Sequence, residues 1–346
     1  MTSIVLRMCA LSAAIALLSL PNSSRAAEPT KRPAKVQISA DKLYRTSNVS
    51  STGHVLVLTW DGKLFDLDLD RLAVALVHDY KSYEAIANAD ISFSDDGKTI
   101  AIFRCDAAVV EILERENSSW KINASRKFME GWAFGAVYLP PEQGVVHVVV
   151  PCQAEEVSGV YFCVVPWNYK QPLLPQKQLM WKFGEQFVFS AMGDEKGERV
   201  VVGGFHATRI FDLKGDDRKV VELEQAGWIR VSPNKELISI SGPLFIGMGE
   251  STQRLTIVDF QGKLRGEFMT GGLPSFAVDS QSLLMIDEKH RIARYRFDGK
   301  PVGEPGEVVA DCKLLIPTSA ARSVALIEDE GLWAVEVPNP PEELKR

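Results

Sequence analysis

Short apolar runs separated by polar turn residues repeat along most of the chain. The clearest example extends from Ile91 to Leu113, where the polar turn Ser94–Gly97 is followed by the apolar runs Thr99–Phe103 and Ala108–Leu113. Glycine at the end of such a turn accommodates a positive φ, and short apolar runs bounded by turn residues are typical of antiparallel strands. This stretch therefore predicts three consecutive strands of one antiparallel unit.

Related units follow one another along the chain. Their first turns are centred at Gly53, Gly97, Gly144, Gly197, Lys235, Gln281 and Arg322. The spacing of about 45 residues is the period of a four-stranded propeller blade. No helical periodicity of useful length interrupts the pattern. The sequence therefore predicts an all-β fold, a seven-bladed β-propeller of four-stranded antiparallel blades.

The two ends of the repeat region complement each other. The last unit has three strands before Pro338 stops it, whereas the alternating segment Lys35–Ala40 precedes the first unit and belongs to no other blade. We therefore expect the ring to be closed by the N-terminal strand, which leaves no open edge between first and last blades. The propeller then covers residues 35–338 and is followed by a C-terminal tail, 339–346.

Residues 1–27 differ from the repeats. Arg7 precedes an apolar run from Cys9 to Leu20, and small residues around Ala26 and Ala27 supply a cleavage site. This pattern predicts a secretory signal peptide, since the run is shorter than the roughly 20 apolar residues that span a membrane. Residues 28–34 form a polar, proline-containing tether. We expect an exported protein, periplasmic or extracellular, with no stable membrane insertion.

The net charge narrows the classes of partner that are expected. The chain has 39 basic and 45 acidic residues, and loss of Arg7 and Arg25 with the signal changes the net charge from −6 to −8. An acidic protein is a poor partner for nucleic acid.

Four cysteines remain after loss of the signal peptide: Cys105, Cys152, Cys163 and Cys312. In an exported chain they permit a disulfide among the first three, or they serve as small buried side chains.

Dipeptides at the ends of the predicted third strands carry a family likeness. They are Phe65-Asp66, Phe211-Asp212, Val258-Asp259 and Phe297-Asp298, accompanied by the first turns Ser94–Gly97 and Ser232–Asn234. With them the chain resembles a seven-bladed β-propeller of the tryptophan-aspartate (WD) repeat type, although tryptophan is missing from each of these positions. Quinoprotein-like and lactonase-like propellers remain alternatives. The resemblance implies that second-to-third loops share one face with the connections to the next blade.

Acidic residues recur on those second-to-third loops. They are Asp61, Asp106, Glu155, Glu156, Glu250, Asp287, Glu288, Glu328, Asp329 and Glu330. One interpretation is an acidic rim that attracts a cation or a basic protein segment. The other is that tight turns favour acidic residues whatever their function.

Three further features are candidates for binding. Aromatic residues precede or begin predicted first strands at Trp132 and Phe134, at Trp181 and Phe183, and at Trp228. They line the channel mouth or wedge between blades. The loop Gly242–Gln253 carries Phe245 and Met248 and either docks a partner, covers the channel or folds onto a neighbouring blade. His206 and His290 lie on corresponding loops, so one interpretation is a metal site shared with Asp287 or Glu288. The other is that both histidines are ordinary solvent-exposed turn residues.

These features favour a non-catalytic platform that binds a protein or a ligand through its acidic loop face. The residues predicted to contact the partner are Glu155, Glu156, His206, Phe245, Met248, Asp287, Glu288 and His290. We expect a monomer with a protein partner, and no catalytic residue, resident metal or cofactor is predicted. The alternative is a lactonase-like hydrolase with a metal at the channel mouth, which requires titratable groups that converge on one point.

Overall fold

The computed structural model describes most of the repeat region. The described residues are 35–36, 43–47, 50, 52–59, 61–69, 71, 73–81, 89–117, 119–131, 133–142, 144–152, 161–171, 181–185, 187–214, 220–242, 253–270, 274–277, 279–287, 289–306, 312–319, 322–327 and 331–336. The predicted signal peptide, tether and C-terminal tail lie outside them and stay predictions. No helix among the described residues is long and apolar enough to cross a membrane.

Six blades consist of four consecutive antiparallel strands each, one fewer than the predicted seven. Blade 1 is β2 (Leu43–Thr46), β3 (His54–Thr59), β4 (Lys63–Asp68) and β5 (Ala73–Asp79), and blade 2 is β6 (Asp90–Phe93), β7 (Thr99–Arg104), β8 (Val109–Glu116) and β9 (Ser119–Lys127). Blade 3 is β10 (Ala136–Tyr138), β11 (Val145–Cys152), β12 (Tyr161–Asn168) and β13 (Trp181–Gly184), and blade 4 is β14 (Val188–Gly193), β15 (Arg199–Gly204), β16 (Thr208–Asp212) and β17 (Val220–Leu223). Blade 5 is β18 (Trp228–Val231), β19 (Leu237–Ser241), β20 (Gln253–Asp259) and β21 (Leu264–Thr270), and blade 6 is β22 (Ser275–Phe276), β23 (Leu283–Ile286), β24 (Ile292–Tyr295) and β25 (Pro301–Val302).

A further four-stranded sheet combines both ends of the described chain. It has the order β1 (Lys35–Val36), β28 (Gly331–Glu336), β27 (Arg322–Ile327) and β26 (Cys312–Ser319). Within it Lys35 pairs with Trp333 and Val36 with Leu332. The N-terminal strand thus lies where the closure prediction places it, and it covers an edge of β28 that would otherwise be open.

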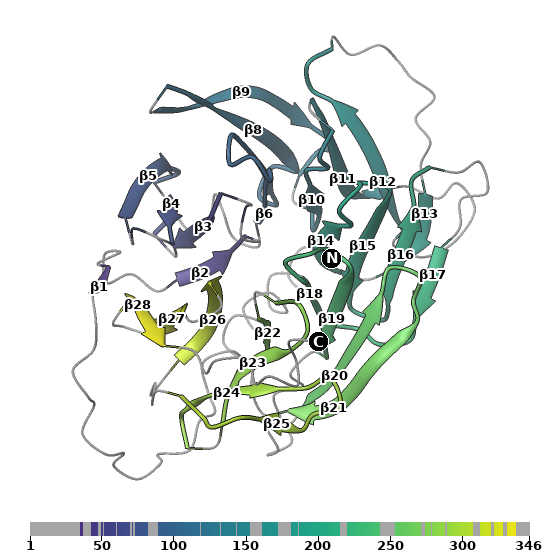
Figure 1. The fold of residues 1–346 in the computed structure, drawn as a ribbon. Helices are drawn as coiled ribbons and strands as arrows, with labels where there is room; N and C mark the ends of the chain where they lie inside the picture. Colours follow the sequence, from purple (N-terminus) through teal and green to yellow (C-terminus); the bar gives the residue numbers. More distant parts are fainter. Residues whose placement is uncertain are drawn as a thin grey trace, which may run out of the picture.

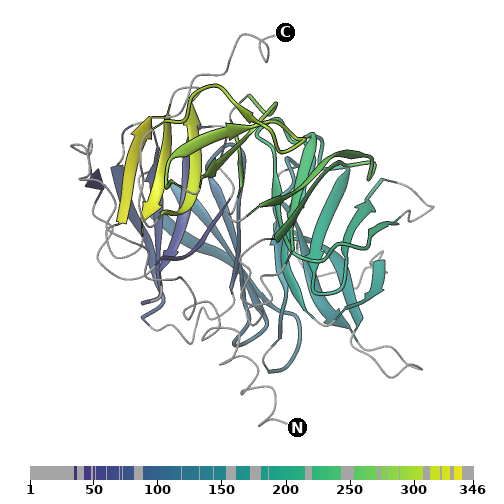
Figure 2. The ribbon, with the colours of Figure 1, turned by 90° about the horizontal axis from the view of Figure 1, so that it is seen from below.

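The sheets are arranged around a common centre. In Figure 1 the first strand of each blade lies nearest the centre, together with β26, and the fourth strands form the periphery. Figure 2 shows the sheets standing side by side, with their strands running between the two faces of the ring. The prediction of an all-β propeller built from four-stranded antiparallel blades is therefore confirmed.

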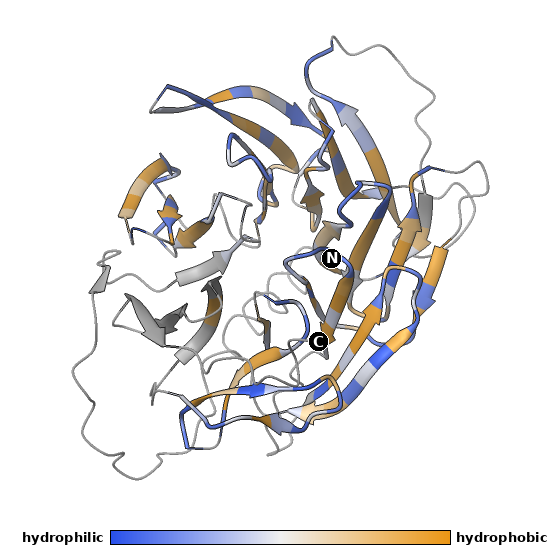
Figure 3. Cartoon of the chain, viewed as in Figure 1, coloured by the Kyte–Doolittle hydropathy of each residue, from blue (hydrophilic) through white to orange (hydrophobic). Residues whose placement is uncertain are grey.

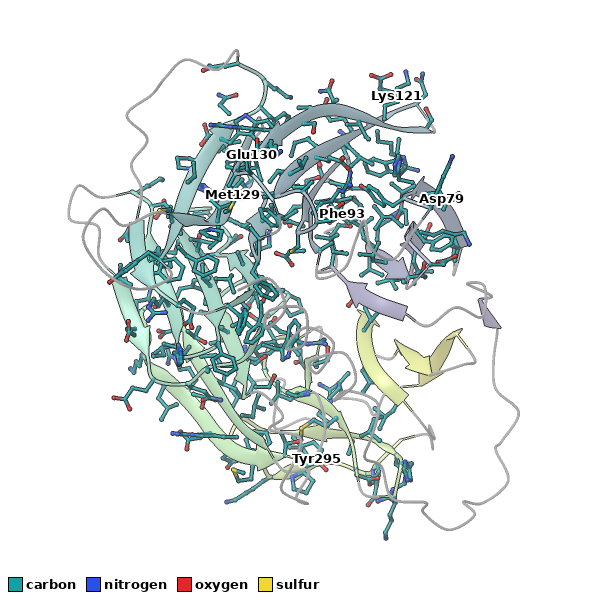
Figure 4. The ribbon with its side chains drawn as sticks, turned by 180° about the vertical axis from the view of Figure 1, so that it is seen from behind. Asp79, Phe93, Lys121, Met129, Glu130 and Tyr295 are labelled. Atoms are coloured by element: carbon teal, nitrogen blue, oxygen red, sulfur yellow. The ribbon has the colours of Figure 1, made fainter. Side chains whose placement is uncertain are left out.

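Burial follows the position of a strand within its blade. Residues Val55 to Thr59 of β3 are all buried, because both faces of this strand pack against neighbouring sheets. The outer strand β9 alternates exposed and half-buried residues along its length. Figure 3 shows the same contrast as apolar inner strands and mixed outer strands. Phe93 packs with Leu56 and Leu58 between blades 1 and 2, whereas Lys121 lies at the outer margin in Figure 4. The apolar core therefore fills the spaces between blades.

The first turns share one local geometry. In blade 2 the hydroxyl of Ser94 accepts the amide of Thr99 at 2.9 Å, and the amide of Gly97 donates to the carbonyl of Ser94 at 3.0 Å. Gly97 has φ of 67°, and an added Cβ would lie 2.8 Å from Oγ1 of Thr52. In blade 5 Lys235 takes the same place with φ of 55°. The polar turn residues predicted from sequence thus close the inner hairpins of blades 2 and 5.

Some strand assignments differ from the prediction. The short first strand β2 was not expected. Trp181–Gly184, of which the sequence analysis named Trp181 and Phe183 as aromatic residues at the start of a blade, is the outer strand of blade 3 and pairs with β12. The expectation that Phe183 begins a blade is therefore wrong. Phe183 is buried between blades 3 and 4 with Phe162 and Phe211, as its alternative interpretation requires.

One described cysteine is disulfide-bonded, whereas the predicted pairing among Cys105, Cys152 and Cys163 stays a prediction. Cys163 on β12 is part of a disulfide bond. Cys105 is buried in the cluster between blades 2 and 3, which also contains Cys163.

Candidate functional site

The antiparallel order of the strands gives the ring two distinct faces. The first-turn face carries the turns that join first to second strands, such as Ser94–Gly97. The second-turn face carries the turns that join second to third strands and the connections that enter the next blade. Of the predicted contact residues, His206, Asp287 and His290 are described and lie on the second-turn face. Glu155, Glu156, Phe245, Met248 and Glu288 lie outside the described residues.

Three described acids of the second-to-third loops are paired with cations. Asp61 bonds to Lys63, Asp106 lies 2.9 Å from Arg104, and Asp287 lies 2.8 Å from Arg291. Burial raises the pKa of Asp287, but hydrogen bonds from Arg291 and from the amide of Lys289 more than offset it, so the pKa lies below its ordinary value. These carboxylates stabilise their own turns. In the described part of this face their charge is locally compensated, which weakens the acidic-rim interpretation there.

His290 and His206 have different surroundings. His290 adopts φ of 58°, and its amide donates to the carbonyl of Asp287 at 2.9 Å, so its backbone closes the turn. His206 is exposed, and its ring contacts Phe205 edge to face at 5.2 Å. Among the described residues no three His, Cys, Asp or Glu side chains are placed to hold a metal ion.

A buried carboxylate holds the turn of blade 4 that carries His206. Glu185, on the segment between β13 and β14, accepts the amides of His206 at 3.0 Å and Ala207 at 3.3 Å, and Nη1 of Arg209 at 3.0 Å. Its side chain is 0% exposed and that of Arg209 is 9% exposed. A Cβ at Gly204 would lie 2.4 Å from Oε2 of Glu185, so glycine permits this close approach. The turn is therefore fixed by a buried ion pair.

Aromatic rings from neighbouring blades meet at this turn and form what we call the aromatic cluster. It consists of Phe134, which precedes β10, Phe187, which precedes β14, and Phe205 and His206 in the second turn of blade 4. The ring centroids of Phe134 and Phe187 lie 4.5 Å apart, and those of Phe187 and Phe205 lie 5.7 Å apart, both edge to face. The three phenylalanines are half-buried. The result is a continuous aromatic surface on the second-turn face.

Two more rings lie on the first strands beside the cluster. Phe189 of β14 and Trp228 of β18 stack with centroids 5.1 Å apart and an interplanar angle of 27°. Trp228 is 45% exposed. The sequence placed Trp228 and Phe134 near the channel mouth, and both lie where first strands begin. Phe187, Phe189 and Phe205 were not singled out, because isolated apolar residues in a strand pattern resemble ordinary core residues.

The first-turn face is held together by side chains that connect different blades. Lys235 of blade 5 forms an ion pair with Asp95 of blade 2, which lies across the ring. The amide of Asn234 donates to Oγ of Ser280 in blade 6 at 3.1 Å. Beside these turns, blades 4 to 6 line a hollow of about 820 Å³ with residues of both charges, including Asp194, Arg199 and Arg265. This end of the channel is therefore crossed by an ion pair.

The Asp95–Lys235 pair allows a test of that cross-ring contact. Replacing Asp95 by asparagine should lower the free energy of unfolding by about 1 kcal/mol, since both side chains remain partly exposed and water screens the pair. A double-mutant cycle with Lys235→Met, followed by urea denaturation, isolates the coupling. Purely additive effects of the two substitutions would show that the pair contributes nothing across the ring.

Comparison with known proteins identifies the fold class. No protein-family model and no curated protein sequence matches the chain. The β-propeller domain of Cps50 (Swd1) from Myceliophteria thermophila is similar with a TM-score of 0.59 at 12% identity, over 90% of this chain and 100% of that domain. A chain from the mitotic checkpoint complex is similar with a TM-score of 0.57 at 12% identity, over 93% of this chain and 99% of that one. The protein is a β-propeller with structural neighbours of the WD40 type.

Proposed function

We propose that the protein is an exported, non-catalytic propeller that binds a protein partner through the second-turn face, with the aromatic cluster as the central contact. In this proposal the six contiguous blades and the sheet formed by β1, β28, β27 and β26 make a ring of seven blades. The proposal concerns a binding surface, so it requires no chemistry by the chain itself.

The observation that carries the proposal is the aromatic cluster. Rings of Phe134, Phe187, Phe205 and His206 come from three separate segments, yet they are held in mutual contact. Rigid, half-buried aromatic side chains are the residues that dominate the affinity of protein interfaces, because they bury a large area at small entropic cost. Glu185 and Arg209 fix the turn beneath them, so the surface is formed before a partner arrives.

Two other features support the wider proposal. The signal-like segment at residues 1–27 and the disulfide at Cys163 both fit an exported protein. The sequence predicts Glu155, Glu156 and Glu288 on second-to-third loops, and in this proposal they belong to the binding face. They would steer a basic segment of the partner toward the aromatic cluster.

A capture experiment with paired variants tests this assignment. The tagged full chain is expressed in its source cell and cross-linked, and the proteins retained by wild type are compared with those retained by a Phe187→Ser, Phe205→Ser variant. We expect the double variant to lose the partner at least tenfold, because both anchors of the cluster are removed. A charge variant with Glu155→Lys, Glu156→Lys and Glu288→Lys should mainly slow association.

The matched control carries Leu76→Ser and Ile122→Ser, which remove two exposed apolar side chains from the outer strands of blades 1 and 2. It should retain the partner in full. Equal retention by the cluster variant and by wild type would contradict the aromatic cluster as the contact. Capture of no protein by wild type would contradict the platform itself.

A further inference from the structure

Strand β18 presents two different sides to its surroundings. Ile229 is 3% exposed and packs in the cluster between blades 4 and 5 with Val201 and Ile210. Because successive side chains of a strand point to opposite sides, Trp228 and Arg230 both point away from that cluster. Trp228, at the start of β18, stacks on Phe189 of the neighbouring first strand β14.

Arg230 has an unusual environment for a cation. Its side chain is partly accessible, yet protein surrounds it, and this burial lowers the pKa of its guanidinium to about 10. Two other enclosed arginines have carboxylate partners: Arg209 bonds to Glu185 at 3.0 Å and Arg294 to Asp279 at 2.6 Å. The side chain of Arg230 makes no hydrogen bond or ion pair with another described residue. A desolvated cation without a counter-charge favours binding of an anion.

The neighbours of Arg230 indicate which kind of anion fits. Trp228 and Arg230 are two residues apart on one strand side, which places their Cα atoms roughly 7 Å from each other. The Trp228 ring is stacked on one face by Phe189 and is 45% exposed. A ligand with a planar apolar group and a carboxylate about that far apart matches both residues, since guanidinium groups bind carboxylates with two parallel hydrogen bonds.

The direction of entry follows from the two ends of the channel. At the first-turn end Lys235 and Asp95 form an ion pair across the ring, and Lys235 is therefore already compensated. Trp228 is the first residue of β18 and lies at the second-turn end. A ligand that enters from that end meets the aromatic rings first and Arg230 farther inside.

We propose that Arg230, Trp228 and Phe189 form a binding site at the second-turn end of the channel for a carboxylate carried on a planar aromatic group. The carboxylate comes from a small organic acid or from the C-terminus of a polypeptide. The site does not depend on the proposed protein-binding function, because a free aromatic acid would occupy it without any partner protein.

Calorimetric titration of the full chain with indole-3-acetate and with the neutral indole-3-acetamide tests the site. The acid should bind at least about tenfold more tightly than the amide, because only the acid pairs with Arg230. The same titration with Gly-Ser-Gly-Ser-Trp, with a free or an amidated C-terminus, distinguishes the two sources. Preference for the small acid assigns a metabolite-like ligand, and preference for the free peptide assigns a chain terminus.

Substitutions separate the two halves of the site. Arg230→Gln should abolish the preference for acid over amide, whereas Trp228→Leu should weaken both ligands to the same extent. Arg230→Gln should also leave the melting temperature unchanged or raised, because it removes an enclosed cation without a partner. Arg296→Gln is the control, since Arg296 is 56% exposed on a peripheral turn. Equal affinity of wild type for acid and amide, or no binding of either, would overturn the proposal.

Discussion

Replacement of Glu185 by alanine is expected to lower the free energy of unfolding by about 3–5 kcal/mol. The carboxylate is fully buried and accepts two backbone amides and Nη1 of Arg209. Its removal leaves the guanidinium of Arg209, which is 9% exposed, without its buried counter-charge. It also leaves the amides of His206 and Ala207 without their acceptor. Chemical denaturation monitored by circular dichroism measures the loss.

Two matched variants identify the cause of that loss. Glu185→Gln keeps the size of the side chain and one acceptor oxygen, so it should destabilise less than alanine. Glu222→Ala removes the other carboxylate that contacts Arg209, at 2.8 Å, but Glu222 is 59% exposed and its loss should cost at most about 1 kcal/mol. If Glu185→Ala and Glu222→Ala had equal effects, the buried pair would not be what stabilises this turn.

The Glu185 variants also connect stability with the proposed binding surface. Phe205 and His206 belong to the turn that Glu185 holds, and Phe205 contacts Phe187 of the next segment. A loosened turn separates these rings and raises the entropic cost of binding. Glu185→Gln should therefore weaken partner capture even at temperatures where the variant is folded.

The regular part of the fold follows from local sequence patterns. Turns such as Ser94–Gly97 and the apolar runs beside them correctly locate the inner hairpins, because side chain and backbone interact within a few residues. The outer strands of blades 4 and 5 were harder to foresee. Their exposed positions alternate apolar and polar residues, as at Val220 and Leu264, and an outer strand needs no continuous apolar run.

The candidate site was predicted only in part, because its contacts join segments that are far apart in the sequence. His206 was singled out because it lies on a second-to-third loop, but its contact with Phe205 and the support from Glu185 depend on packing between segments. Asp95 and Lys235 are 140 residues apart, and no local pattern links them. Arg230 resembles any charged residue of a short strand until the direction of its side chain is known. Sequence periodicity gives the loop on which a residue lies, while tertiary structure decides its partners.

The stability of the protein should also depend on pH through His147. This residue of β11 is buried beside Tyr138, with ring centroids 6.2 Å apart, and its Nδ1 has no hydrogen-bond partner among the described residues. Burial lowers the pKa of His147 from 6.5 to about 4 in the folded protein. The unfolded chain therefore binds a proton at higher pH than the folded protein does. The stabilisation is complete above the unfolded pKa, near 6.5, and is lost as the pH falls toward 4.

The expected loss is about 2 kcal/mol between pH 7 and pH 5 and about 3 kcal/mol by pH 4. Urea denaturation at pH 7, 6 and 5 measures it above the range in which most carboxylates titrate. His147→Phe keeps a planar ring in the same space and cannot be protonated, so the slope of stability against pH should fall by that amount in the variant. If the free energy of unfolding changed with pH in the same way for wild type and His147→Phe, the protonation of His147 would not be linked to folding. The prediction would then be wrong.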